Sequence, residues 1–178
     1  MCCTFDEMEE PSTVSERSDE QQRLDWRLRW LTSIQSFADT DTQRRRWLDP
    51  AEENPHFSYV ECMCVYFDDV LWGEDEPYRR RLEGGFLSET EVAAVAEFHA
   101  LADGHKSPNG DDWNSRAILE DLAWQEVVRA AEQAQHRLLP LLSDPAEREA
   151  LTRPEHWDDQ DETYRAQRTG ATIVRLRS

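Results

Sequence analysis

Apolar residues recur every three or four positions through the middle of the chain, a spacing that places them on one side of an α-helix. The first such segment spans residues 19–38. A face this broad belongs in a protein core, so the pattern predicts a helix that is buried along one side. The residues of that face are Leu24, Leu28, Leu31 and Ile34, widened by Trp26, Trp30 and Phe37.

The same spacing predicts further helices downstream, separated by turns rich in glycine and proline. Residues Val92, Val95, Ala96 and His99 are expected to form the packed face of one of them. Gly84-Gly85 predicts a turn. The expected segments are 42–48, 58–72, a single turn at 78–82, 89–102, 115–142 and 145–151.

The segment that ends at residue 142 has two candidate starting points, Ser115 and Asp121. Pro140 is expected to kink its last turn, because proline lacks a backbone donor and clashes with the preceding turn. Its apolar side is Ile118, Leu122, Val127, Val128, Ala131, Ala134, Leu138 and Leu142.

Helix-start signals support this assignment. Ser18, Thr40, Ser58 and Ser88 are each followed three residues later by Gln or Glu, the pattern of a capping box in which the two side chains satisfy each other's backbone amides. Asp144 precedes a proline at the first helical position. Several such signals, each before an apolar period near 3.6, predict an all-α fold.

The expected architecture is one compact bundle of about five to seven helices. We predict a disordered acidic tail over 1–17, a helical domain over 18–152 and a polar tail or arm over 153–178, because the ends offer little to bury. Residues 171–176 fit either an edge strand or an ordered arm. No partner strand is evident elsewhere, which favours the arm.

Charge narrows the range of partners. The chain has 38 acidic and 20 basic side chains and a net charge of −18. A nucleic-acid binder needs a basic footprint, and docking on an anionic membrane needs one as well, so both classes are excluded. A basic protein partner is favoured, with fast and salt-sensitive association. The alternative is that the charge serves solubility alone.

Cysteine spacing and the N-terminus predict the cytoplasm. The four cysteines occur as Cys2-Cys3 and Cys62-x-Cys64, which are poor spacings for a disulfide scaffold. No apolar run approaches the roughly 18 residues of a membrane span, and the first residues do not resemble a signal peptide. Cys62 and Cys64 fall on different faces of one helix, so they are expected to pack as small residues and not to share a metal.

No constellation of residues predicts catalysis. The histidines lie at scattered positions, and Glu132 and His136 have the spacing of an ordinary surface pair. His99 falls on an apolar face, as a core histidine would. Phosphate-binding glycine loops, nucleophile elbows and zinc-ligand spacings do not occur in the sequence. We therefore predict no enzymatic activity, no cofactor and no metal.

Two acidic segments beside tryptophans are the candidate partner-binding residues. Aromatic anchors framed by charge are typical of binding hot spots. The alternative is a pair of solvated loops whose tryptophans pack into the core. The candidate residues are Asp68, Asp69, Trp72, Glu74, Asp75 and Glu76 in one segment and Asp111, Asp112 and Trp113 in the other.

Over residues 20–150 the chain resembles small acidic bacterial proteins of unknown function, and it is similar in build to immunity proteins that neutralise secreted toxins. This resemblance implies an all-α fold and an inhibitory role. Its motifs are folding residues, so no functional site is carried over. They are Asp41-Thr42-Gln43-Arg44-Arg45-Arg46-Trp47-Leu48, the 58–70 helix with Phe67-Asp68-Asp69, Gly85-x-Leu87-x-x-x-Glu91, and Trp124-x-x-Val127.

The first hypothesis for function is thus an acidic protein-binding module, an immunity or antitoxin type of inhibitor of a basic partner such as a toxin. The alternative is a self-associating structural or regulatory protein, a homodimer with Trp26 and Trp30 of the first helix at its interface. A third hypothesis is an enzyme that uses His99 or His136 with a carboxylate.

Overall fold

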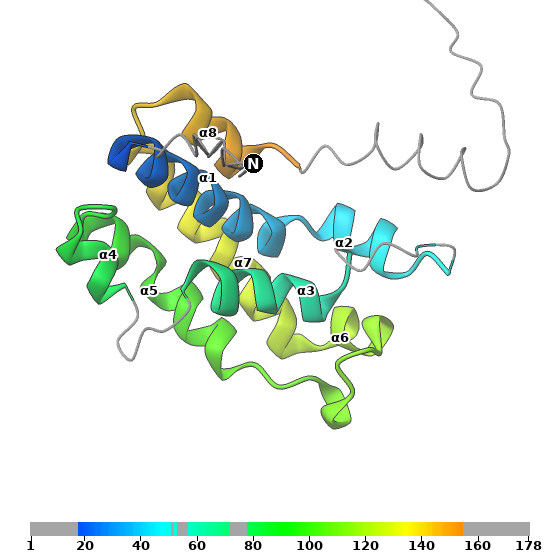
Figure 1. Ribbon diagram of the computed structural model, residues 1–178. Helices are drawn as coiled ribbons and strands as arrows, with labels where there is room; N and C mark the ends of the chain where they lie inside the picture. The colour runs from blue at the N-terminus through cyan, green and yellow to red at the C-terminus, as the bar shows by residue number, and fades with distance from the viewer. Residues whose placement is uncertain (1–17, 51, 53–56, 72–77, 155–178) are drawn as a thin grey trace, which may run out of the picture.

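The computed structural model describes residues 18–50, 52, 57–71 and 78–154. These residues form an all-α bundle, as predicted (Figure 1). The α-helices are α1 (Asp19–Ala38), α2 (Thr40–Trp47), α3 (Tyr59–Cys64), α4 (Arg79–Glu83), α5 (Glu89–Gly104), α6 (Ser115–Glu120), α7 (Leu122–Leu138) and α8 (Pro145–Thr152). A π-helical turn, η1 (Val65–Val70), continues α3, and two 3₁₀ turns are η2 (Pro108–Gly110) and η3 (Leu139–Leu141).

Helix α1 is the centre of the arrangement. It packs against α7 and α8, and its opposite side meets α3 and η1, while α5 lies along α7 (Figure 1). The face of α1 that the sequence pattern predicts is the buried one: Trp30, Leu31, Ile34 and Phe37 have no exposed surface. Phe37 lies at the middle of the core, with its ring 5.0 Å from that of Phe98 and 5.6 Å from that of Trp124.

Most of the predicted helix starts are confirmed. Ser18, Ser58 and Asp144 accept hydrogen bonds from backbone amides of the first turns of α1, α3 and α8. Ser88 forms the complete capping box with Glu91, whose carboxylate accepts from the Ser88 amide at 2.8 Å. The prediction for Thr40 is wrong. Asp39 caps α2 by accepting from the Thr42 amide at 2.9 Å. The helix therefore begins at Thr40, two residues before the predicted start of the segment 42–48.

The long segment 115–142 divides at Asp121, whose carboxylate accepts from the Ala123 amide and caps α7. Both candidate starting points are therefore helix starts, which raises the number of α-helices among the described residues to eight. Leu122 is 73% exposed, contrary to the prediction, because the first position of α7 lies outside the bundle. Pro140 converts the end of α7 into the 3₁₀ turn η3.

Three other expectations need correction. Ala96 is exposed, because the buried face of α5 is centred on Val95, Phe98 and Ala102. The segment 58–72 changes from α to π geometry at Val65, a change that apolar spacing does not encode. Trp30 is fully buried and so cannot lie on a dimer surface.

Trp26 is also held inside the fold. It stacks on Trp30, and its indole N–H donates to the carbonyl of Val70 at 3.0 Å. The proposed homodimer interface through these two tryptophans is therefore wrong. The expected tails over 1–17 and 153–178 lie outside the described residues, apart from Arg153 and Pro154.

A buried ionic cluster joins three helices. The guanidinium of Arg27 on α1 donates to Glu91 on α5 at 2.7 Å, to Glu147 on α8 and to the carbonyl of Phe86 at 2.7 Å. Burial by itself lowers the pKa of Arg27, but the hydrogen bonds and charges of the two carboxylates outweigh it and raise the pKa above its ordinary value. The cluster therefore stays ionised.

Replacing Arg27 with methionine should lower the free energy of unfolding by about 3–5 kcal/mol, because two buried carboxylates lose their counter-charge. Urea unfolding followed by circular dichroism measures this. Arg116→Met is the control. That arginine is exposed and lies 3.9 Å from Glu120, so its loss should cost less than about 1 kcal/mol. Equal losses in both variants would mean that the cluster does not stabilise the fold.

Acid should weaken the same cluster. Burial raises the pKa of Glu91, but hydrogen bonds from Arg27 and Ser88 more than offset this, so its pKa is lowered from 4.5. A carboxyl group with a lowered folded-state pKa stabilises the fold above its unfolded pKa, and this contribution is lost as pH falls through the folded pKa. Glu91→Gln should therefore lose less stability than the wild type below about pH 4.5. The exposed Glu89→Gln is the control, and parallel curves for all three proteins would contradict the assignment.

Candidate partner-binding site

Trp113 projects from the loop between α5 and α6 and is 75% exposed. It differs in this from Trp26, Trp30, Trp47 and Trp124, which all belong to the core or pack against it. Asp111 and Asp112 beside it are also exposed. The sequence left open whether this tryptophan packs inside or faces solvent. The structure places it at the surface, directly after two exposed aspartates.

The loop holds Trp113 in a defined position. The carboxylate of Asp111 accepts from the Trp113 amide at 3.1 Å, and Ser107 donates to Asp112 at 2.5 Å. Asn114 then caps α6 by accepting from the Ala117 amide. A loop whose backbone is already ordered loses less conformational entropy on binding. This loop can therefore present an aromatic anchor at low cost.

The buried side chain of His105 connects this loop to the neighbouring helices. The Nε2 of His105 lies 3.3 Å from Asp121, and its Nδ1 lies 2.9 Å from the hydroxyl of Tyr59. Because a carboxylate only accepts, Nε2 carries the proton and Nδ1 accepts from Tyr59. Burial lowers the pKa of His105 more than Asp121 raises it, so the ring is neutral. Burial, together with the charge of Asp112, raises the pKa of Tyr59 to about 12.

His105 was not a candidate residue in the sequence, because its position next to Gly104 in a loop resembles that of a solvent-exposed histidine. Only the packing of α3 and α7 around that loop buries it. Its role here is structural. It ties the loop to the start of α3 and to the start of α7.

The second acidic segment is only partly described. Asp68 and Asp69 are exposed at the end of η1, and Asp69 pairs with Arg29 of α1 at 3.3 Å. Burial and the neighbouring carboxylate of Asp68 raise the pKa of the Cys64 thiol. The other predicted residues of this segment, Trp72, Glu74, Asp75 and Glu76, lie outside the described residues.

The two acidic segments do not form one patch. The charge of Asp112 is felt by Tyr59 at the start of α3, so Asp112 lies near that end. Asp68 and Asp69 lie near the other end, at the close of η1. About ten helical residues separate these points, roughly 15 Å at about 1.5 Å per residue. A partner that touches both segments must therefore span this side of the molecule.

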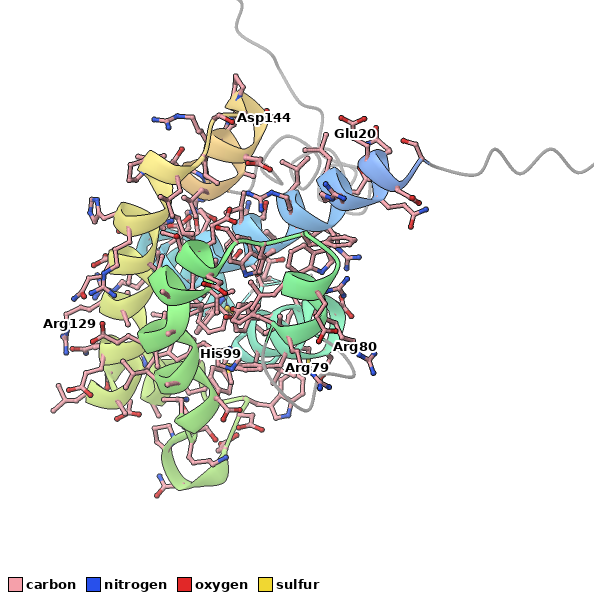
Figure 2. All side chains as sticks on the ribbon, turned by 90° about the vertical axis from the view of Figure 1, so that its left-hand side faces the viewer. Glu20, Arg79, Arg80, His99, Arg129 and Asp144 are labelled. Carbon is pink, nitrogen blue, oxygen red and sulfur yellow. The ribbon has the colours of Figure 1, made fainter. Side chains whose placement is uncertain are left out.

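The histidines proposed for catalysis occupy different surroundings. His99 lies among the rings of Tyr66, Phe67 and Tyr78, on the part of α5 seen near α4 in Figure 2. Burial lowers its pKa despite the charge of Asp103, so it is a neutral ring in an aromatic cluster. His136 is exposed on α7. Neither lines the pocket described next.

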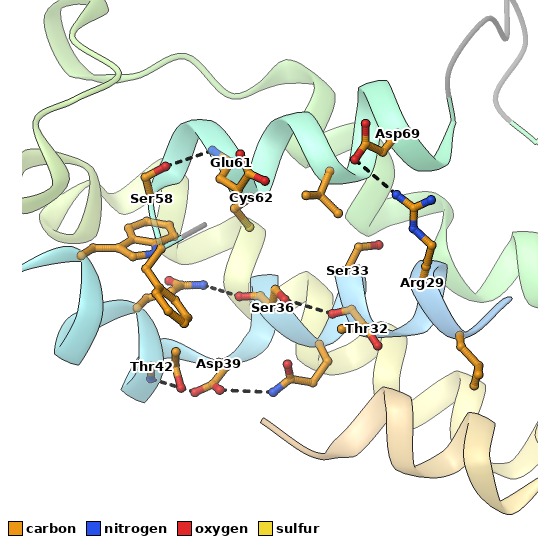
Figure 3. Close-up of a pocket in the computed structure, with 16 residues that line it drawn as sticks. Arg29, Thr32, Ser33, Ser36, Asp39, Thr42, Ser58, Glu61, Cys62 and Asp69 are labelled. Carbon is orange, nitrogen blue, oxygen red and sulfur yellow. Dashed lines mark hydrogen bonds and ion pairs between the residues drawn. The ribbon is translucent and has the colours of Figure 1, made fainter. Parts of the chain in front are cut away.

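The sequence did not predict the pocket between α1 and the segment formed by α2, α3 and η1 (Figure 3). It has a volume of about 400 Å³. Its walls carry Thr32, Ser33 and Ser36 of α1 and Glu61 and Cys62 of α3. Small polar residues on a helix resemble a solvated face in the sequence, so no local signal revealed that another helix stands opposite them.

The described residues contain neither a metal-binding cluster nor a membrane-spanning helix. Among the described residues, no three His, Cys, Asp or Glu side chains are grouped so as to hold a metal ion. No helix in that part of the chain is long and apolar enough to cross a membrane. Cys62 and Cys64 are each partly buried, and neither forms a disulfide with another described residue.

No protein-family model, curated protein or solved structure matches the chain. The resemblance to toxin-immunity proteins therefore stays a prediction.

Proposed function

We propose that this chain is an acidic protein-binding module, an immunity or antitoxin type of inhibitor of a basic partner protein in the cytoplasm. The observation that carries the proposal is Trp113, 75% exposed and directly preceded by two exposed aspartates. An exposed indole leaves a large apolar area in water, and a partner gains by covering it.

The surroundings of Trp113 match a hot spot. Such sites combine an aromatic anchor with a charged rim, and tryptophan is the residue most enriched in them. The Asp111 and Asp112 carboxylates would meet lysine or arginine side chains of the partner around the buried indole. Leu122, also exposed, starts the helix that follows α6 and adds apolar surface to this end of the molecule.

Long-range charge supports the same kind of partner. The described residues include 24 acidic and 15 basic side chains, so half of the net charge of −18 belongs to the helical body. A body of this sign attracts basic proteins and speeds their encounter. An inhibitory role follows from the same chemistry, since a nuclease that grips phosphate with arginine and lysine offers a cationic cleft that carboxylates can occupy.

Self-association remains the second candidate, and Trp113 with Leu122 is the surface that favours it. The mass of the protein in solution distinguishes the two. A monomer mass by light scattering at every concentration supports a different partner, whereas a mass that doubles with concentration and returns to one chain in Trp113→Ala supports the dimer.

Trp113→Ala should reduce capture of the partner from native cells by tenfold or more, because hot-spot tryptophans contribute about 2 kcal/mol or more. Quantitative mass spectrometry of the proteins retained at low and at high salt measures this. Leu141→Ala, which removes a partly exposed apolar side chain from η3, is the control and should retain the partner. Equal retention by both variants would remove Trp113 from the binding site.

Charge reversal at Asp111 and Asp112 to lysine should slow association with the captured partner and flatten its dependence on salt. Stopped-flow or surface-based kinetics over a range of salt concentrations measures both effects. The control reverses two exposed carboxylates of α7, Glu126 and Glu132, and so changes the net charge equally. If both double variants slow association to the same extent, only the overall charge steers the partner, and this loop has no local role.

A further inference from the structure

The pocket beside α1 is an elongated groove. Its lining runs along α1 from Leu28 to Asp39, roughly 16 Å at about 1.5 Å per residue. Arg29 and Asp69 lie at one end, and Thr42 and Ser58 lie at the other (Figure 3). The rings of Trp47 and Phe57 also line the pocket. An extended peptide advances about 3.3 Å per residue, so the groove matches about five residues of such a chain.

The wall on α1 offers hydrogen-bond acceptors and few donors. The hydroxyl of Ser33 donates to the carbonyl of Trp30 at 2.7 Å, and that of Ser36 donates to the carbonyl of Thr32 at 3.1 Å. Each hydroxyl has one hydrogen, so both oxygens are left to accept. At these two positions a ligand can therefore bind only by donating.

The side-chain amide of Gln43, which also lines the groove, is already used in bonds within the fold. The side-chain N–H groups of Gln43 donate to the carbonyls of Ser36 and Phe37, at 2.8 and 2.9 Å, and its oxygen accepts from Trp124. Gln35 donates to Asp39 at 3.2 Å. The side chain of Gln43 thus joins α1, α2 and α7, and that of Gln35 bonds the residue that caps α2.

The charged residues of the lining are mostly acidic. They are Asp39, Glu61 and Asp69, together with Arg29, which pairs with Asp69. Within the chain itself, the guanidinium of Arg46 lies 4.8 Å from the centroid of the Phe57 ring, so a ring of the lining already stacks with a guanidinium. Acceptors, negative charge and aromatic rings together select a ligand that is cationic, rich in donors and long.

We propose that this groove binds an extended, arginine- or lysine-bearing segment of the basic partner. The inference deepens the proposed function and rests on it, while the groove itself is separate from the Trp113 loop. Arginine suits the site best, because its planar guanidinium supplies five donors and can stack on an aromatic ring. The alkyl stems of such side chains would lie along Leu28 and Val65.

The test uses the acetylated and amidated pentapeptide Arg-Ala-Arg-Ala-Arg, with calorimetry for affinity and the indole N–H resonances of Trp47 and Trp113 for location. The peptide should bind and shift the Trp47 resonance, while that of Trp113 stays in place. The same peptide with citrulline in place of arginine keeps the shape without the charge and should bind at least tenfold more weakly. Equal binding of both peptides, or a shift of Trp113 alone, would overturn the proposal.

Two variants separate the groove from the overall charge. Thr32→Arg places a cation inside the groove and should weaken peptide binding tenfold or more. Thr90→Arg makes the same change of charge at an exposed position of α5 and should weaken it less than twofold. Equal weakening in both would show non-specific attraction and overturn the proposal. Glu61→Gln against the exposed Glu126→Gln repeats the comparison with a near-isosteric change, should Thr32→Arg unfold the protein.

Two further arms complete the design. Spermidine, a free polyamine, should bind more weakly than the peptide, because it has no backbone or guanidinium to use the acceptors of α1. Spermidine binding as tightly as the peptide would replace the peptide segment by a polyamine. If Trp113→Ala abolishes partner capture but Thr32→Arg leaves it intact, the proposed function stands and the groove inference falls.

Discussion

The guanidinium of Arg27 is the contact on which the position of α1 depends. It bonds one carboxylate at the start of α5 and another on α8, and so fixes where the first helix lies between two late ones. A charge buried at this depth is tolerated only because both partners are present, and the capping box of Ser88 also holds Glu91. The rest of the bundle is arranged around the helix that this cluster positions.

Helix α1 then serves two purposes with two faces. Trp30, Ile34 and Phe37 enter the core, whereas Thr32 and Ser36 line the groove. Gln43 fixes the end of α1 relative to α7, because its side chain bonds the carbonyl of Ser36 on α1 and the indole N–H of Trp124 on α7. Any change that shifts α1 would therefore change the width of the groove. Stability and binding are thus coupled through a single helix.

The surface proposed for the partner depends on a different part of the core. His105, Tyr59 and Asp121 hold the loop that carries Trp113, and their bonds leave the histidine neutral. The groove and the loop both reach the start of α3, since Ser58 lines the groove and Tyr59 bonds His105. A basic partner could therefore use an aromatic anchor at one place and an extended segment at the other.

The amino-acid pattern alone determined the helices, because apolar spacing and caps such as those at Ser18 and Ser88 are local. It also determined the net charge of −18, from which a basic partner is predicted. It could not show that Asp39 caps α2 in place of Thr40, or foresee the exposure of Leu122. Those outcomes depend on which helix stands opposite. The groove beside α1 also depends on the tertiary structure. In the sequence its polar residues resemble those of a solvated surface. They form a pocket only because α2, α3 and η1 pack opposite them.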